Sequence, residues 1–230
     1  MNDPIANNLL RVNADIATAC VRSGRLPDDV TLVAVTKYAE RPWICRLIEL
    51  GVTNLAENRP QQLIERFESL RGEISWHLIG QLQRNKVRPV LPLAMLIHSV
   101  DSLRLLERIA TVAAELSLTP RVLLEVNVSG EASKNGFSIA ELTSQWDALQ
   151  AVPLVQIAGL MTMAPLGNDP ESARPMFRTL RLLRDELARR ATLSTKLTEL
   201  SMGMSSDFQV AIEEGATLVR IGSRLFEGMS

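Results

Sequence analysis

Lys37 is the first residue in this sequence whose type and position could do chemistry. It follows a nearly continuous apolar run at residues 31–36 (Thr-Leu-Val-Ala-Val-Thr), which is typical of a strand buried on both faces in a parallel sheet. Lysine is seldom fully buried without a partner, so its amine either reaches water or enters a pocket. Because α/β folds carry their chemistry at the carboxyl ends of strands, a pocket there could place the amine to form an imine. This run alone leaves both interpretations open.

A second stretch could bind an anion. Residues 203–207 (Gly-Met-Ser-Ser-Asp) place a glycine, two hydroxyls and free main-chain N–H groups at the predicted start of a helix. Such an arrangement binds phosphate through amide donors and the helix dipole. Residues 222–223 (Gly-Ser) add a second glycine and hydroxyl turn. Ser205 or Ser206 could instead cap the helix with the same donors, and Asp207 would repel a phosphate if its carboxylate faced inward.

Polar or chargeable side chains follow almost every predicted strand. Singly, each has a structural explanation, since an asparagine after a strand commonly belongs to a turn and a histidine is commonly a hydrogen-bonded core residue. A closed barrel, however, brings the carboxyl ends of all its strands to one mouth. Together these residues predict a polar mouth on an apolar barrel. They are Lys37, Glu57, Asn58, His77, Gln81, Asn85, His98, Ser99, Asn127, Thr162, Ser201, Ser205, Ser206, Arg220 and Ser223.

Strands and helices that would position these residues alternate along the chain. Strands are predicted at residues 31–37, 53–57, 75–80, 94–100, 121–128, 154–161, 196–203 and 217–222. Helices are predicted at residues 4–23, 42–50, 60–70, 102–118, 139–149, 171–191 and 205–214, with a polar, basic segment at residues 81–88. This alternation in 230 residues favours a single (β/α)₈ TIM barrel spanning residues 1–230, with an extra N-terminal helix. A doubly wound open sheet is the alternative.

The composition excludes several classes of function. The 25 Lys and Arg residues against 26 Asp and Glu residues give a formal net charge of −1, so no overall field would recruit nucleic acid or an anionic membrane. No apolar run approaches the roughly 20 residues that span a bilayer. The two cysteines and the lack of a leader at the start favour a reducing cytoplasm. Arg84, Lys86 and Arg88 could form a docking surface, although solvated charge is the simpler interpretation.

An amine and an anion site in one mouth are what pyridoxal 5′-phosphate (PLP) requires. PLP forms an imine with a lysine and is anchored by its phosphate. An aldolase that acts on phosphosugars through a Schiff-base lysine needs the same two parts. The group that faces the pyridine nitrogen would distinguish the two, and the residue types considered so far leave both open.

Several motifs make the sequence similar to a known family. They are residues 35–37 (Val-Thr-Lys), 56–58 (Ala-Glu-Asn), 76–86 (Trp-His-Leu-Ile-Gly-Gln-Leu-Gln-Arg-Asn-Lys), 134–137 (Lys-Asn-Gly-Phe), 159–161 (Gly-Leu-Met), 200–205 (Leu-Ser-Met-Gly-Met-Ser) and 219–222 (Val-Arg-Ile-Gly). They resemble the signatures of the pyridoxal-phosphate homeostasis protein family, single-domain relatives of the alanine racemase barrel. The resemblance extends from about residue 8 to about residue 228, and its longer motifs are specific. It implies the barrel of the alanine racemase N-terminal domain.

The resemblance also implies roles for individual residues. Lys37 would hold PLP as a Schiff base, Asn58 would lie close to the ring, and His77 would lie further into the mouth. Arg220 would face the pyridine nitrogen. No catalytic residue and no metal ligand are implied. The phosphate would be bound, mostly through hydroxyls and main-chain N–H groups, by Ser205, Ser206, Gly222 and Ser223.

Arg220 beside the pyridine nitrogen would have a chemical consequence. A guanidinium is always protonated, so it can only donate a hydrogen bond to the ring nitrogen, which then stays uncharged. An aspartate in that place would keep a pyridinium, which is a strong electron sink. We therefore expect a weak sink that disfavours carbanion chemistry such as transamination. A surface-paired arginine is the alternative, but the apolar neighbours Val219 and Ile221 favour an interior or mouth position.

The function implied by the resemblance is that of a carrier or regulator of PLP. Such a protein would affect amino-acid and keto-acid metabolism and could deliver PLP to PLP-dependent apoenzymes. A weakly active PLP-dependent racemase or lyase is the alternative. Racemases of this kind use a tyrosine supplied by a second domain across a dimer, whereas the only tyrosine here is Tyr38. We expect a monomer in the cytoplasm.

Four positions depart from the family pattern. They lie beside the lysine, in the second and third motifs, and in the predicted phosphate loop, so we expect them to alter loop geometry and phosphate affinity. They are Tyr38, Ala56, Gln81 and Ser206.

Overall fold

The computed structural model describes residues 3–131, 135–165, 167, 169–192 and 195–229. Asn2, which precedes the predicted first helix, Lys134 of the motif at residues 134–137, and Ser230 lie outside the described residues.

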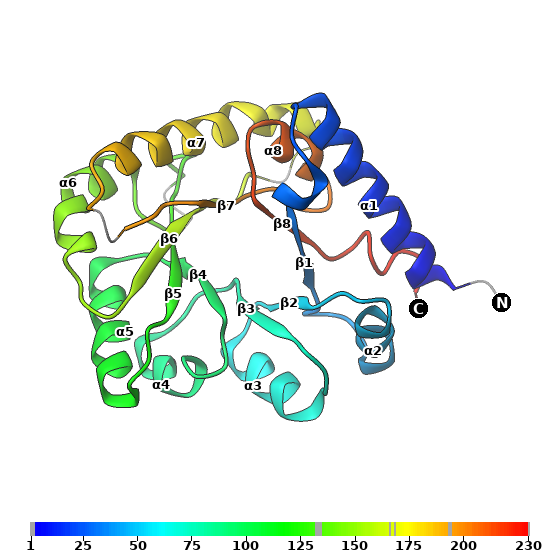
Figure 1. The fold of residues 1–230 in the computed structure, drawn as a ribbon, viewed down its shortest axis with the longest axis horizontal. Coiled ribbons are helices and arrows are strands. Elements are labelled where there is room, and N and C mark those ends of the chain that lie inside the picture. The colour runs from blue at the N-terminus through cyan, green and yellow to red at the C-terminus, as the bar shows by residue number, and fades with distance from the viewer. Residues whose placement is uncertain (1–2, 132–134, 166, 168, 193–194, 230) are drawn as a thin grey trace.

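Eight parallel strands close into a barrel in chain order (Figure 1). They are β1 Thr31–Val35, β2 Asn54–Glu57, β3 Ser75–Leu78, β4 Leu96–Val100, β5 Arg121–Glu125, β6 Gln156–Met161, β7 Glu199–Ser201 and β8 Leu218–Ile221. The ring closes because β1 pairs with β8 over four residue pairs, with Val33 opposite Arg220. The predicted (β/α)₈ barrel is confirmed, and the alternative of an open sheet is wrong.

Helices surround the strands on the outside of the barrel (Figure 1). This arrangement buries the apolar face of each helix against the outer faces of the strands. The helices are α1 Pro4–Arg22, α2 Arg41–Glu49, α3 Pro60–Ser69, α4 Val87–Val90, α5 Leu103–Leu116, α6 Ile139–Gln150, α7 Arg174–Arg189 and α8 Phe208–Glu213.

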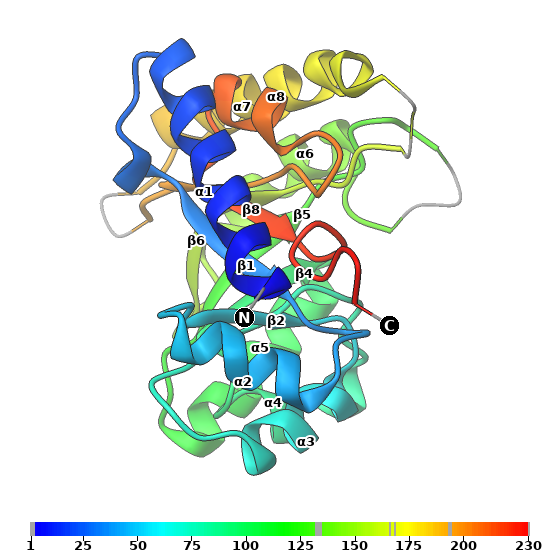
Figure 2. The ribbon, with the colours of Figure 1, turned by 90° about the vertical axis from the view of Figure 1, so that its right-hand side faces the viewer.

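Helix α1 is the extra N-terminal helix that the sequence predicts. Asp3 caps it by accepting a hydrogen bond from the main-chain N–H of Ala6 at 3.1 Å, and Pro4 occupies the first turn. The helix packs along α8 and α2 on the outside of the barrel (Figure 2). The side-chain amide of Asn8 donates to the carbonyl oxygen of Glu227 at 2.9 Å. This bond ties the C-terminal segment to α1, so the described ends of the chain lie close together.

Some element boundaries differ from the predicted ones. Strand β1 ends at Val35 and not at Lys37, because the N–H of Ala39 donates to the carbonyl of Thr36 and closes a turn. The segment predicted as polar and basic forms a 3₁₀ turn followed by α4, which buries Val87 and Val90. Periodicity did not find α4, since a four-residue helix is too short to display an apolar face.

The barrel interior is packed with side chains from alternate positions on the strands, as expected of this fold. Its apolar part consists of Val33, Ala56, Leu96, Leu123, Ala158, Met161 and Leu218. At the amino ends of the strands, Arg121 donates to Glu199 at 3.2 Å, and the hydroxyl of Thr217 donates to the other carboxylate oxygen of Glu199 at 2.8 Å. Because these side chains fill the barrel at the amino ends of its strands, we expect a ligand to enter from the carboxyl ends.

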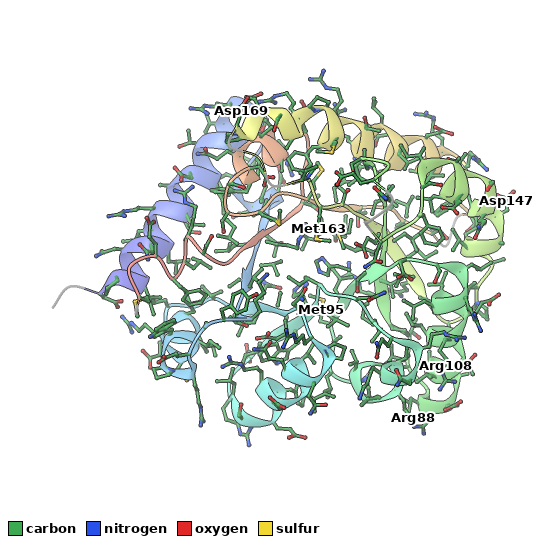
Figure 3. The ribbon with its side chains drawn as sticks, turned by 180° about the vertical axis from the view of Figure 1, so that it is seen from behind. Arg88, Met95, Arg108, Asp147, Met163 and Asp169 are labelled. Carbon is green, nitrogen blue, oxygen red and sulfur yellow. The ribbon has the colours of Figure 1, made fainter. Side chains whose placement is uncertain are left out.

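Met95, which precedes β4, and Met163, which follows β6, lie near the centre of the ring, with Arg88 and Asp147 at its periphery (Figure 3).

Candidate functional site

Arg220 on β8 lies inside the barrel and is only 4% exposed. Its Nη1 donates to Ser201 Oγ at 2.6 Å, and its Nη2 donates to the carbonyl oxygen of Thr162 at 2.9 Å. Burial lowers the pKa of Arg220 to about 10, while Asp207 and Glu125 act in the opposite direction. The guanidinium therefore stays protonated at neutral pH. The expected interior position of Arg220 is confirmed.

Ser205 and Gly222 meet between the loops that follow β7 and β8. The N–H of Gly222 donates to Ser205 Oγ at 3.2 Å, so the hydroxyl proton of Ser205 is available to donate elsewhere. A Cβ added at Gly222 would lie 3.2 Å from the carbonyl oxygen of Val35. Glycine therefore lets the end of β8 approach β1 closely. Ser206 and Ser223 are exposed in the same two loops.

Asp207 does not present its carboxylate freely to the loop. One carboxylate oxygen accepts from the N–H of Met204 at 2.6 Å, and the residue is 5% exposed. Burial raises the pKa of Asp207, against the effect of the Met204 hydrogen bond and of Arg220. The residue thus closes the loop that carries Ser205. Helix α8 has only six residues, so an anion here would be held by hydroxyls and local amides more than by a helix dipole.

Lys37 is exposed in the turn that follows β1. Its Nζ lies 5.1 Å from the centre of the Tyr38 ring. Lys37, Tyr38 and Asn58 line a cavity of about 390 Å³ together with Gln62 and Glu65 of α3. The structure thus brings Lys37 and Asn58 together, as expected for neighbouring strands.

The predicted residues fall into three groups on four consecutive strands. Lys37 and Asn58 follow β1 and β2, Ser205 and Gly222 follow β7 and β8, and Arg220 lies on β8 itself. Strand order 7-8-1-2 makes these loops neighbours at one end of the barrel. Among the described residues, no hydrogen bond joins one group to another.

The turn that carries Lys37 is held by Glu57 of β2, which the sequence placed in the polar mouth, and by two residues of α3 that the sequence did not single out. Gln62 donates to the carbonyl oxygen of Lys37 at 2.9 Å, and Arg66 donates to that of Ala39 at 2.7 Å. The hydroxyl of Thr36 donates to Glu57 Oε1 at 2.6 Å. These bonds fix the main chain of the turn while leaving the side chain of Lys37 free to rotate.

Glu57 is fully buried beneath this turn. Its Oε2 has no hydrogen-bond partner among the described residues, and Arg66 lies 3.8 Å from Oε1. Burial raises the pKa of Glu57, against the effects of the Thr36 hydrogen bond and of Arg66. The sequence placed Glu57 among the polar residues of the mouth, and the structure buries it below the turn.

His77 lies deeper than the sequence predicted. Its Nε2 is 3.0 Å from Oδ1 of Asn54, the first residue of β2, and its Nδ1 is 2.8 Å from Nε2 of His98. Both rings are fully buried in the barrel. The resemblance placed His77 further into the mouth than Asn58, and in the structure its side chain is directed toward the amino end of β2. Pairing with His98 decides this direction, and the sequence could not supply that contact.

Glu125 at the carboxyl end of β5 is a further buried acid, 6% exposed, that the sequence missed. Burial raises its pKa to about 7, nearby Asp101 adds to this shift, and Arg220 opposes it. The sequence missed Glu125 because the predicted strand extended to Val128, which placed Asn127 at the strand end in place of Glu125.

Other predicted features have simpler explanations. Arg84 and Lys86 are exposed, and Arg88 forms an ion pair with Glu115. Within the described ranges, no helix is long and apolar enough to cross a membrane, and no group of three or more His, Cys, Asp or Glu residues is placed to hold a metal ion.

Comparison with known proteins adds independent findings. Residues 10–229 match the family model for the alanine racemase N-terminal domain. A pyridoxal phosphate homeostasis protein of Aquifex aeolicus is 42% identical over 219 residues, which cover 95% of each chain. A solved structure of an unknown protein from Bifidobacterium adolescentis is 36% identical with a TM-score of 0.89, covering 98% of this chain and 97% of that one. PipY of Synechococcus elongatus, solved with PLP bound, is 37% identical with a TM-score of 0.81, covering 92% of this chain and 99% of that one.

Proposed function

This chain belongs to the pyridoxal phosphate homeostasis proteins, within the alanine racemase N-terminal domain family, and from that membership we propose that it binds PLP at the mouth of its barrel. The family of the chain and the PLP bound to PipY support the cofactor. In this proposal Lys37 forms a Schiff base with the aldehyde of PLP. When bound, PLP supplies that aldehyde and an aromatic ring that withdraws electrons.

The observation that carries the proposal is the arrangement of an amine, a hydroxyl and amide cradle, and a buried guanidinium on adjacent strands. Lys37 has a flexible four-carbon stem, so rotation about its side-chain bonds can move Nζ from Tyr38 into the mouth. Ser205 has a hydroxyl proton available for a phosphate oxygen, since its Oγ already accepts from Gly222. We assign phosphate binding to Ser205 and Gly222, together with Ser206 and Ser223.

Arg220 is the proposed partner of the pyridine nitrogen. Two of its five N–H groups donate to Ser201 and Thr162, and in this proposal one of the other three donates to the pyridine nitrogen. Since a guanidinium has no acceptor atom, it leaves the ring nitrogen unprotonated. The proposed role is therefore to hold and release PLP, with little support for carbanion chemistry.

The proposed biological role is buffering and delivery of PLP, with effects on amino-acid and keto-acid metabolism. The recipients in this proposal are PLP-dependent apoenzymes, and the carrier acts as a monomer in the cytoplasm. Mixing the loaded protein with an apoenzyme should restore that enzyme's activity faster than dilution alone releases PLP. Steady turnover of a D- or L-amino acid by the loaded protein, at about 1 per second or faster, would contradict the carrier role.

The absorption spectrum of the purified protein titrated with PLP tests the proposal directly. The wild-type protein should develop the absorption band of an imine, and borohydride should fix the cofactor to the peptide that contains Lys37. Lys37→Ala should lose the band and the fixation. Lys196→Ala is the matched control that should keep both, because Lys196 precedes β7 and therefore lies at the amino ends of the strands, away from the mouth. Retention of the band in Lys37→Ala would contradict the proposed attachment.

A further inference from the structure

A continuous line of polar side chains crosses the barrel interior from β8 to β2. Nη1 of Arg220 lies 2.6 Å from Ser201 Oγ, which lies 2.8 Å from Nδ1 of His98. Nε2 of His98 lies 2.8 Å from Nδ1 of His77, whose Nε2 lies 3.0 Å from Oδ1 of Asn54. The three middle residues are fully buried. The five residues lie on five different strands, β8, β7, β4, β3 and β2, so the line passes through the barrel interior.

The direction of the hydrogen bonds follows first from Arg220. A guanidinium has donors and no acceptor, so Ser201 Oγ must accept from it. The hydroxyl proton of Ser201 then needs an acceptor, and Nδ1 of His98 is the atom within reach. A neutral imidazole that accepts at Nδ1 carries its proton on Nε2. His98 therefore donates from Nε2 to Nδ1 of His77.

The other end of the line gives the same direction independently. The side-chain nitrogen of Asn54 donates to the hydroxyl of Thr53 at 3.4 Å, which turns its Oδ1 toward His77. An amide oxygen can only accept, so Nε2 of His77 must be its donor. Nδ1 of His77 is then the acceptor that His98 requires. Every polar hydrogen along the line has one acceptor in this arrangement.

We propose that Arg220, Ser201, His98, His77 and Asn54 form a hydrogen-bond chain of fixed direction, in which both histidines are neutral Nε2–H tautomers and Ser201 and His98 are positioning residues for Arg220. The part that concerns Arg220 rests on the proposed PLP-binding function. The part that concerns the histidines is a property of the barrel alone.

The direction of the chain matters because Arg220 is a buried charge. A buried charge is costly unless dipoles or counter-charges compensate it. Each acceptor atom in the chain faces toward Arg220 and each donor points away, so the dipoles of the chain favour the guanidinium. Ser201 accepts from Nη1 and the carbonyl oxygen of Thr162 accepts from Nη2, which leaves three of the five N–H groups for the pyridine nitrogen.

The histidines support this arrangement by staying uncharged. Burial lowers the pKa of His77 to about 4, with Arg121 adding to the shift. Burial lowers the pKa of His98 well below its usual value, with His77 and Arg220 adding to it. Protonation of either ring would place a second donor where the chain has an acceptor, and would break its direction.

Nitrogen NMR of the protein without PLP tests the chain, and the assignment is simple because the sequence has two histidines. At pH 7 long-range ¹H–¹⁵N spectra should show both rings protonated at Nε2 and unprotonated at Nδ1. The reversed direction, with Nδ1–H in both rings, would overturn the proposal. Rapid exchange between tautomers in either ring would also overturn it.

Two serine variants test the positioning role. Ser201→Ala removes the link between Arg220 and His98, so the Nδ1 resonance of His98 should shift and PLP affinity should fall about tenfold, equivalent to about 1.4 kcal/mol. Ser201→Thr keeps a hydroxyl and should restore the resonance. Ser99→Ala is the matched control: Ser99 is equally buried on β4 but donates to the carbonyl of Gly80, outside the chain.

These measurements distinguish a failure of the proposed hydrogen-bond chain from a failure of the proposed PLP-binding function. An unshifted His98 resonance in Ser201→Ala, or an equal loss of PLP affinity in Ser99→Ala, would overturn the positioning role. Thermal unfolding of each variant, measured alongside, identifies a general loss of structure, and the wild-type tautomers decide the chain even if a variant does not fold. Failure of the wild-type protein to bind PLP would overturn the proposed function while leaving the tautomer result intact.

Discussion

At the scale of single residues, Glu125 makes the stability of the folded protein depend on pH. It lies at the end of β5, almost fully buried, with Asp101 and Arg220 as the charged groups that act on it. Burial raises its pKa from 4.5 to about 7. A group whose pKa is raised in the folded state contributes stability that is complete below its unfolded pKa. That contribution is lost as the pH rises through the folded pKa of about 7.

Glu125→Gln should therefore stabilise the protein without PLP at pH 8 more than at pH 5. The glutamine is neutral at every pH and avoids the ionised, buried carboxylate, whose cost approaches about 3 kcal/mol at about 1.4 kcal/mol per pKa unit. Thermal unfolding of variant and wild type between pH 5 and pH 8 should show a melting-temperature difference that grows by several degrees. Glu68→Gln, at an exposed position on α3, should show no such trend. A difference independent of pH would contradict the raised pKa.

At the scale of elements, α7 and α8 are joined by an ion-pair cluster around Glu214. Arg174, Arg178 and Arg181 of α7 all donate to its carboxylate, at 3.3, 2.9 and 3.3 Å. Burial raises the pKa of Glu214, but the hydrogen bonds from Arg178, Arg174 and Arg181 together leave it below its usual value. Its contribution to stability is therefore present above about pH 4.5 and lost as the pH falls.

Glu214→Gln should lower the free energy of unfolding by about 2 kcal/mol at pH 7, between the values typical of exposed and buried pairs. Urea unfolding at pH 7 and again near pH 3.5 measures this, and the difference from wild type should shrink at the lower pH. Glu186→Gln is the matched control, because Glu186 is half-exposed and lies 4.0 Å from Arg190. An equal loss in both variants would show that the cluster has no special role.

The pairing of β6 with β7 depends on one glycine. A Cβ at Gly159 would lie 1.9 Å from the carbonyl oxygen of Glu199, its partner in the register. Two strands cannot both keep their places at that distance, so the backbone would have to shift.

Gly159→Ala should destabilise the barrel by about 3 kcal/mol or more, measured by urea unfolding. Gly24→Ala is the comparison: nothing lies within 4 Å of its added Cβ, and its φ of +68° should cost only about 1 kcal/mol. The contrast separates steric contact from backbone strain. Equal effects would mean that β6 can move away from β7 at little cost.

At the scale of the whole molecule, a ligand that spans several strands should stabilise the entire barrel. In the proposed site PLP contacts the loops after β1, β7 and β8, and β1 and β8 close the ring. A ligand that binds only the folded protein stabilises it by about 2.7 kcal/mol at one hundred times its dissociation constant. For a protein of this size that corresponds to a melting temperature about 5–10 °C higher.

PLP at that concentration should produce this increase in differential scanning calorimetry. Pyridoxal, which lacks the phosphate, should produce a much smaller increase at the same concentration because Ser205 and its neighbours then have no anion to bind. Equal increases with both compounds would contradict the assigned phosphate site. Sedimentation of the loaded protein at a mass near 25.4 kDa would support the proposed monomer, and a dimer mass would contradict it.

The sequence by itself determined the order and type of the main elements. It predicted a helix at residues 4–23, where α1 forms, and short apolar runs ending in polar residues located all eight strands, because these signals come from neighbours along the chain. It also placed Lys37, Ser205 and Arg220 near the carboxyl ends of the first, seventh and eighth strands. It did not find the short helix α4, and it extended β5 past Glu125, because the end of a strand depends on its partners.

Only the tertiary structure decided which polar residues meet. His98 and Ser201 lie 103 positions apart in the sequence and 2.8 Å apart in the barrel, and Thr36 reaches Glu57 only because β1 pairs with β2. The same closure buries His77 in the barrel interior and places it beside Asn54. Contacts of this kind depend on ring closure and strand register, which are properties of the packed molecule and not of any local segment.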